Sequence, residues 1–184
     1  IGLLEGDPMD VCLERFDAYL PYRPGCGVIH GSGWGSGVVK GFNEDTWEIR
    51  VRFEDGCRRE LPLSSAVDNL MPLDEGDLRI MVMTRPDELK EMAQKDPALA
   101  IRKALALRPK VTLTAAKVKE ILVGQVVPAE EWSRWWTRAK QAAAKDPYLL
   151  LEGGSRPVFQ LRDKPVSIQE EAMASLEETA DLSE

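Results

Sequence analysis

The sequence has few of the residues and motifs on which enzymes depend. It contains one histidine, His30, which excludes any mechanism that needs two. Its three cysteines, Cys12, Cys26 and Cys57, form no Cys-x-x-Cys pair and leave one over, so neither a disulfide framework nor a zinc site is indicated. The run GSGWGSG contains neither GxGxxG nor GxxxxGK[ST], and no GxSxG or HExxH occurs. We therefore expect no catalytic residue, no metal, no cofactor and no small-molecule substrate.

Membrane-spanning and targeting segments are also missing. No apolar run approaches the roughly 20 residues that cross a bilayer, and the first ten residues lack the charged start and apolar middle of a signal peptide. We expect a cytoplasmic protein without membrane contact, which also fits the cysteine usage. The chain begins with Ile1 rather than Met, which predicts a piece of a longer protein. Its 184 residues predict one to two domains.

Charge is unevenly distributed along the chain. Residues 1–96 have a net charge of −8 and residues 97–164 a net charge of +7, while 165–184 contain 6 acidic residues and no basic one. A basic block inside an acidic chain is typical of an electrostatic footprint for nucleic acid.

The first half of the chain predicts a short helix followed by a small β domain. Residues 1–24 show helical spacing that ends at two prolines. Residues 25–76 are rich in glycine, and the segment 47–54 alternates apolar and charged residues before the hairpin signal Asp55-Gly56. This pattern indicates a Tudor-like small antiparallel β-barrel.

The second half predicts helices and then a hairpin, so the fold class is α+β. Residues 77–164 contain four helix starts, the last at Pro128, and then two short strands, 148–152 and 158–162. Helices followed by a β-hairpin wing are typical of a winged-helix-like domain. The tail, 165–184, begins with a capping box and predicts an acidic helix.

The helix that starts at Pro128 is the most informative segment. Trp132, Trp135 and Trp136 share one helical face, which favours core packing over stacking on bases. The opposite face is basic and can lie along phosphates or simply be solvated. If it binds nucleic acid, the candidate residues on this helix and its hairpin are Arg134, Arg138, Lys145 and Arg156.

In the β domain, Trp47 and Phe53 are predicted to be buried, whereas Trp34 lies between glycines and is the better candidate for an exposed contact. The basic residues of the two paired strands form a possible basic edge, but Glu48, Glu54 and Glu60 lie among them, so cross-strand salt pairs are the simpler explanation. The candidate partner-binding residues are Trp34, Arg58 and Arg59.

Two stretches together resemble a known family. They are HGSGWGSGVVKGFNED…WEIRVRFEDG…ELPLSSAVDNLMPL and VVPAEEWSRWWTRAKQAAAKDPYL, in which the Trp-x-x-Trp-Trp helix followed by Asp146-Pro147 is the more specific part. They resemble the amino-terminal extension of long bacterial Gre-type transcription elongation (transcript cleavage) factors. In those chains a Tudor-like barrel and a tryptophan-rich helical module precede a Gre domain that binds RNA polymerase. Their catalytic acidic pair lies at the tip of a coiled-coil hairpin, which this sequence lacks, so no catalytic residue is carried over.

Two functions of different classes follow. The first is a non-catalytic binding module of a transcription elongation factor that contacts RNA polymerase, nearby DNA or RNA, or both, with weak and non-specific nucleic-acid binding. The alternative is a protein-interaction scaffold with no nucleic-acid contact. Salt dependence separates the two, because phosphate neutralisation makes affinity fall steeply with salt.

Overall fold

The computed structural model describes residues 8–153 and 156–166. By its internal contacts the chain divides into two compact units, 1–85 and 86–184. The predicted helical tail lies outside the described residues. Within the described ranges, no helix combines the length and the apolar character needed to span a membrane.

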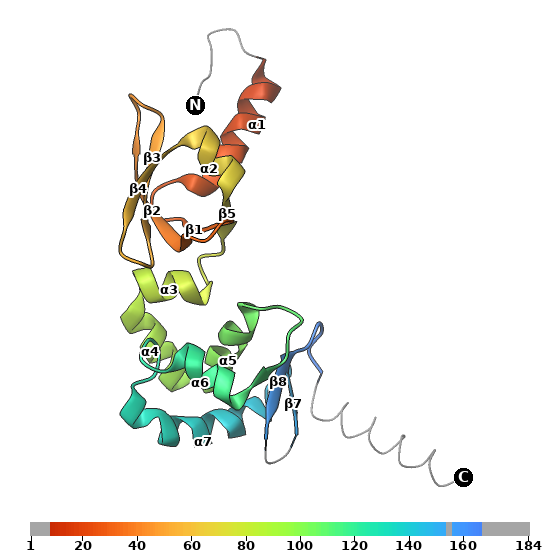
Figure 1. The fold of residues 1–184 in the computed structure, drawn as a ribbon. Coiled ribbons are helices and arrows are strands. Elements are labelled where there is room, and N and C mark those ends of the chain that lie inside the picture. Colours follow the sequence, from red (N-terminus) through yellow and green to blue (C-terminus); the bar gives the residue numbers. More distant parts are fainter. Residues whose placement is uncertain (1–7, 154–155, 167–184) are drawn as a thin grey trace, which may run out of the picture. The chain divides into compact units, whose positions relative to one another are not determined.

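From residue 8 onward, the first unit consists of a five-stranded antiparallel sheet and three α-helices (Figure 1). The strand order β4-β3-β2-β1-β5 consists of a four-strand meander with β5 added beside β1. The elements are α1 (Met9–Tyr19), the 3-10 helix η1 (Leu20–Tyr22), β1 (Gly27–His30), β2 (Gly35–Asn43), β3 (Glu48–Phe53), β4 (Arg58–Pro62), α2 (Leu63–Asn69), β5 (Leu70–Leu73) and α3 (Leu78–Thr84).

The predicted strands and the Asp55-Gly56 turn are present, but the sheet is not a closed barrel. Gly56 takes the left-handed conformation, φ +83°, that the turn needs, and the Cys57 N–H donates to Asp55 Oδ1 at 2.8 Å. Strands β4 and β5 are the two edges of the sheet and do not pair with each other. The helix α2, which connects these two strands in the sequence, contacts β3, β4 and β5 and was not predicted.

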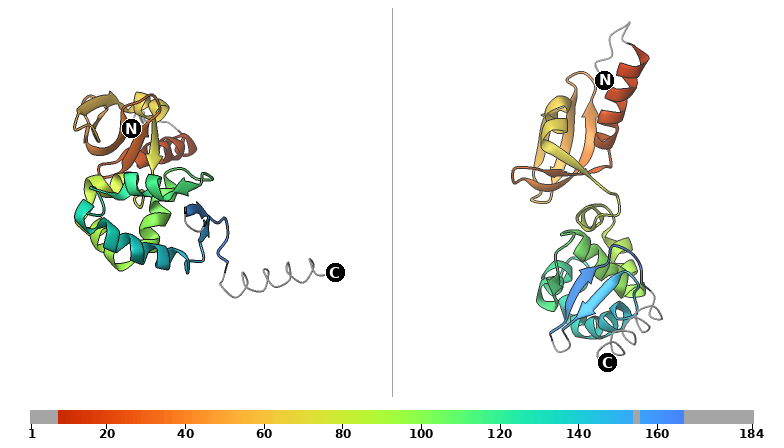
Figure 2. Two further views of the ribbon diagram at one scale, coloured as in Figure 1. Left: turned by 60° about the horizontal axis from the view of Figure 1, so that its bottom comes forward. Right: turned by 90° about the vertical axis from the view of Figure 1, so that its right-hand side faces the viewer.

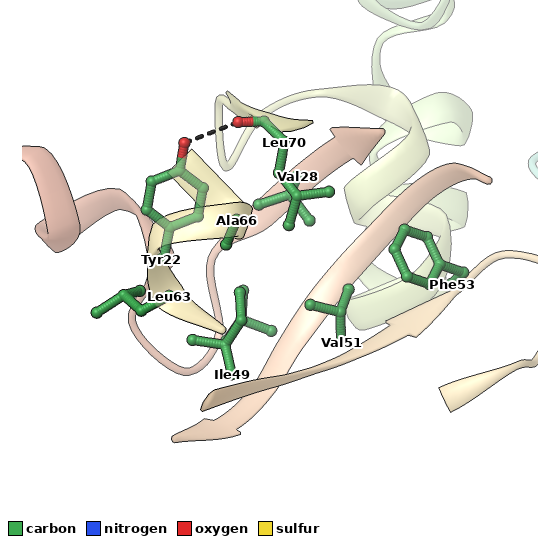
Figure 3. Close-up of a cluster of buried hydrophobic side chains, with 9 residues drawn as sticks. Tyr22, Val28, Ile49, Val51, Phe53, Leu63, Ala66 and Leu70 are labelled. Carbon is green, nitrogen blue, oxygen red and sulfur yellow. Dashed lines mark hydrogen bonds between the residues drawn. The ribbon is translucent and has the colours of Figure 1, made fainter. Parts of the chain in front are cut away.

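The core of the first unit explains the alternation in β3 (Figure 3). Ile49, Val51 and Phe53 are buried, and the residues between them are exposed. Tyr22 closes the core and donates its hydroxyl hydrogen to the Leu70 carbonyl at 2.7 Å (Figure 3). Burial, with a smaller effect of Asp68, raises the pKa of Tyr22.

The prediction that Trp47 is buried was wrong. It is 39% exposed and precedes β3 with φ +57°, so it lies outside the alternating register that buries Phe53. Its ring contacts Phe42 edge-on, with 5.6 Å between the ring centroids. The turn before β3 determines the position of the Trp47 side chain, and the alternation of buried and exposed residues begins only within β3.

The described part of the second unit, 86–153 and 156–166, contains four α-helices and a three-stranded sheet (Figure 1). Its elements are α4 (Pro86–Lys95), α5 (Pro97–Ala106), β6 (Leu113–Thr114), α6 (Ala115–Leu122), the 3-10 helix η2 (Ala129–Glu131), α7 (Trp132–Ala143), β7 (Leu149–Glu152) and β8 (Val158–Leu161). The predicted caps form: the Asp96 carboxylate accepts the Leu99 N–H at 2.9 Å, and the Thr114 hydroxyl accepts the Lys117 N–H at 3.4 Å.

The predicted order of helices followed by a hairpin is present, with one addition. Strands β7 and β8 form the hairpin and run side by side (Figure 2). The two-residue strand β6, just before α6, pairs antiparallel with β8 and completes a sheet of order β6-β8-β7. The hairpin is thereby hydrogen-bonded to the residues that directly precede α6, the first helix of the pair α6 and α7.

Candidate nucleic-acid interface

Two of the three tryptophans of α7, Trp132 and Trp135, are buried in the core as predicted, and Trp136 is half-buried. Trp135 is 1% exposed, and Trp132 is also buried. Trp132 stacks on Trp136, with ring centroids 5.2 Å apart, and Trp136 meets Phe159 of β8 edge-on at 5.5 Å. The aromatic face of α7 is therefore used to hold the helix against the hairpin and the other helices.

Trp135 also donates a hydrogen bond to a backbone carbonyl of α4 that has no donor within its own helix. Its indole N–H donates to the Ala93 carbonyl in the last turn of α4 at 2.8 Å. In a continuing helix that carbonyl would accept from the residue four positions later, which is Pro97 and has no N–H. The indole satisfies a carbonyl that would otherwise be buried without a partner.

Asp146, of the Asp-Pro pair that follows α7, fixes the turn into β7. Its carboxylate accepts the Tyr148 N–H at 2.8 Å and lies 3.4 Å from the Arg102 guanidinium of α5. Arg102 also lies over the Tyr148 ring, 5.0 Å from its centroid. This part of the Trp-x-x-Trp-Trp…Asp-Pro pattern thus has a structural role that the sequence analysis missed.

The face of α7 away from its tryptophans is exposed and basic. Arg134 and Arg138 are one turn apart on it, and Lys145 follows the end of the helix. Within the described part of the chain, Arg134 and Lys145 form no ion pair. Lys140, which the sequence analysis did not name, is also exposed on α7. No described acidic residue lies within α7 itself, so its charge is wholly positive.

Arg138 differs from the other three candidates because its side chain is hydrogen-bonded to the carboxyl end of α4. Its guanidinium donates to the Gln94 carbonyl at 2.5 Å, beside the carbonyl that Trp135 satisfies. A cation at the carboxyl end of a helix also interacts favourably with the helix dipole. Arg138 therefore caps α4.

Arg156 lies in the turn between β7 and β8. Its backbone N–H donates to the Gly153 carbonyl at 2.9 Å, and its side chain is exposed. Gly153 has φ +88°, and a Cβ there would come within 2.6 Å of the Arg156 carbonyl oxygen, so the turn requires glycine. The conformation of Gly153 therefore determines the backbone conformation of the turn that carries Arg156.

The candidate residues of the first unit do not form one exposed patch. Trp34 is half-buried and stacks on His30, with ring centroids 4.0 Å apart, and the Arg59 guanidinium lies 4.4 Å from its ring centroid. Arg59 also approaches Asp55 at 3.8 Å. The pKa of Asp55 is lowered, chiefly by the backbone N–H of Cys57. Trp34 and Arg59 are therefore in contact with each other, whereas Arg58 is exposed on β4.

The predicted cross-strand salt pairs do not form among the described residues of β3 and β4. Arg52 is opposite Arg58, and Arg50 is opposite Glu60 without forming an ion pair. Among the described residues of these two strands and their turn, the ion pair that forms joins Arg59 to Asp55. The composition of the strands suggested charge compensation, and only the register shows that two arginines face each other.

The described part of the chain does not assemble a metal site. No three side chains of His, Cys, Asp or Glu lie close enough there to hold a metal ion. His30 accepts the Ser32 N–H at its Nδ1 and stacks on Trp34, so its ring is part of an aromatic contact.

Comparison with known proteins confirms the resemblance to Gre-type factors. Residues 79–166 match the GRAD helix-turn-helix domain family. Transcription elongation factor GreA of Chlamydia trachomatis is 31% identical over 178 residues, which is 96% of this chain and 24% of that protein. The GreA of Chlamydia pneumoniae is 28% identical over 176 residues, 89% of this chain and 24% of the relative.

The similarity also extends to a protein named for these domains. The putative GreA-associated domains protein of Treponema pallidum is 23% identical over 160 residues, 86% of this chain and 24% of that protein. No solved structure matches. The chain thus spans about a quarter of the length of these relatives, and homology to GreA-type factors covers most of it, consistent with an extension of a Gre-type factor.

Proposed function

We propose that this chain, which is homologous to Gre-type elongation factors over most of its length, is a non-catalytic binding module of a bacterial transcription elongation factor. It contacts RNA polymerase and the nucleic acid beside it. The observation that carries the proposal is the exposed basic face of α7, the second helix of a helix pair in a segment that matches a helix-turn-helix family.

The topology of the second unit supports a winged helix. In such domains a helix, a short strand, two further helices and a two-stranded wing follow one another, and the second helix of the pair contacts DNA. Here α5, β6, α6, α7, β7 and β8 occur in that order, and β6 pairs with the hairpin. We assign α7 as the helix that faces nucleic acid and the β7–β8 turn as the wing.

The distribution of cations supports contact with phosphates. Arg134 and Lys145 have no carboxylate partner in the described part of the chain, and Arg156 projects from the wing. Because Arg138 caps α4, its contribution to binding is smaller. Few phosphate contacts give weak affinity, and contacts to the backbone carry no base information, so binding is non-specific.

The polymerase contact is proposed from the relatives, which are named as transcription elongation factors. A module of such a factor acts on a transcribing complex, which places it in the cytoplasm of a bacterium. We assign this contact to the first unit, as a Tudor-like sheet whose last two strands are separated by α2. The lack of catalysis is proposed from the missing acidic pair on a coiled-coil hairpin, and we expect no RNA cleavage when the chain alone is added to stalled elongation complexes.

The scaffold alternative has its own supporting observation. Met9, Leu13, Phe16 and Leu20 recur at helical spacing on α1 and η1 and are exposed. Phe16 and Leu20 also line an apolar groove with Phe42 and Leu63. A surface of this kind favours a protein partner and does not require nucleic acid.

Titration of a labelled DNA duplex with the full chain tests the proposal. The variant Arg134→Gln/Lys145→Gln should weaken binding about equally for every sequence. It should also reduce the slope of log affinity against log salt by about 2, because each phosphate contact contributes about 0.9. The variant Lys90→Gln/Lys95→Gln, which removes the same charge from α4, is the control and should leave the slope unchanged. No binding of the wild type at low salt, with polymerase still captured, leaves the scaffold function.

A further inference from the structure

The first unit has a basic groove that the proposed function does not use. It lies over β2, β3 and β4 and has a volume of about 750 Å³. Arg50 and Arg52 reach it from the face of β3 opposite to the buried Ile49, Val51 and Phe53. The charged residues that line it are Lys40, Arg50, Arg52, Arg58, Arg59 and Glu60. We propose that this groove binds the phosphate backbone of duplex DNA, as a site separate from α7.

The groove is positively charged, although the unit that contains it has a negative net charge. Residues 1–85 contain 9 basic and 15 acidic residues, a net charge of −6. Five of the nine basic residues line this one groove, beside a single carboxylate. A concave surface of one sign raises the local concentration of counter-ions. A ligand at β3 and β4 therefore encounters a local positive charge, despite the negative net charge of the unit.

Two arginines of the groove, Arg52 and Arg58, lack the acidic partners that a structural role would give them. Arg52 and Arg58 are directly opposite each other on β3 and β4. Like charges in this position destabilise a sheet. Within the described ranges, neither they nor Lys40 form an ion pair with a carboxylate. A bound anion would compensate this repulsion.

Local backbone features make room for these side chains. The register of β2 and β3 shifts between Val39 and Gly41, so Lys40 lies in a bulge, a feature that redirects a side chain. A Cβ on Gly41 would lie 2.6 Å from an Arg50 guanidinium nitrogen, so the glycine allows Arg50 to lie across β2.

Phosphate of a nucleic-acid backbone fits the groove better than a protein partner does. Protein interfaces depend on aromatic or apolar anchors, and the one apolar residue that lines the groove, Val51, is buried in the core. Guanidinium groups match the oxygens of phosphate in pairs. Arg50 and Arg52 are two residues apart on one strand, about 7 Å, a spacing at which they can contact neighbouring phosphates.

A duplex is favoured over a single strand because no aromatic side chain lines the groove. Sites for single strands combine basic grooves with aromatic rings on which bases stack. A duplex presents its phosphates outward at high density and needs no stacking surface. The groove therefore contributes a second, sequence-independent contact to DNA.

The test is a salt titration of the full chain with a short labelled DNA duplex. The variant Arg52→Gln/Arg58→Gln should weaken binding and reduce the slope of log affinity against log salt by about 2. The control Lys90→Gln/Lys95→Gln removes the same charge from α4 and should leave the slope unchanged. Thermal unfolding should show that the groove variant is at least as stable as the wild type, because a repulsive pair has been removed.

The same titration in the Arg134→Gln/Lys145→Gln background separates this inference from the proposed function. If the groove binds DNA, residual binding in that background is lost when Arg52 and Arg58 are also replaced, whatever the effect of the α7 variant alone. An unchanged slope for Arg52→Gln/Arg58→Gln in both backgrounds overturns the inference. Binding of poly-glutamate as tight as that of the duplex, and dependent on the same two arginines, also overturns it, in favour of an acidic protein partner.

Discussion

Replacement of Trp135 tests whether the aromatic face of α7 is core or a binding surface. The residue is 1% exposed, and its indole N–H is bonded to the Ala93 carbonyl, which Pro97 leaves without a helical donor. Truncation of a buried tryptophan costs about 3–5 kcal/mol, and the unpaired carbonyl places Trp135→Ala at the upper end of that range. Trp135→Phe keeps most of the ring and loses the hydrogen bond, so we expect about 1–3 kcal/mol.

Urea unfolding followed by circular dichroism measures both variants. Since the chain has two compact units, the transition of the second unit should move to lower urea while that of the first stays in place. Duplex binding measured at low urea should be retained by Trp135→Phe. An unchanged midpoint for Trp135→Ala together with lost DNA binding would refute the reasoning, because it would show that the tryptophan contacts a ligand and not the core.

Three further variants test individual contacts. Arg138→Gln should lower the free energy of unfolding by about 1 kcal/mol, a value kept low because the Arg138 side chain is exposed. It should change the salt slope of DNA binding less than Arg134→Gln does. A larger change in slope for Arg138→Gln than for Arg134→Gln would contradict the role of Arg138 as a helix cap. Arg58→Glu should raise stability by about 0.5 kcal/mol in thermal unfolding, because it places opposite charges across β3 and β4; a loss of stability would contradict the register. The raised pKa of Tyr22 means that its contribution to stability is present below its unfolded pKa, about 10, and is lost as pH rises through the folded pKa. Tyr22→Phe should therefore be less stable than the wild type at neutral pH and lose less stability above pH about 10, as alkaline unfolding curves would show.

The sequence predicted much of the second unit because its signals are local. Asp96, Thr114 and Pro128 stand at the starts of helices, and the spacing of the tryptophans on α7 defined its buried face. Caps and periodicity act within a few residues, so they can be read without a tertiary structure. The strand of this sheet that was not predicted is β6, whose two residues are too few to show a period.

The environment of the residues proposed for binding was harder to predict, because it depends on partners that are distant in the sequence. Arg138 looked equivalent to Arg134, and only the position of the α4 carboxyl end shows that it caps that helix. Arg52 and Arg58 looked compensated by nearby glutamates until the register placed them opposite each other. The apolar period of β3 extends to Trp47 in the sequence, but Trp47 has φ +57° and belongs to the turn that precedes the strand.

The most direct test of the proposed function is binding of the full chain to a bacterial RNA polymerase assembled on a DNA–RNA scaffold. Size-exclusion chromatography at low salt would show whether the chain co-elutes with the complex. We predict that the wild type co-elutes and that Arg134→Gln/Lys145→Gln does so less as salt is raised, because its nucleic-acid contact is weaker while its polymerase contact is intact. Failure of the wild type to co-elute at any salt concentration would contradict the proposal that this chain is a binding module of the transcription machinery.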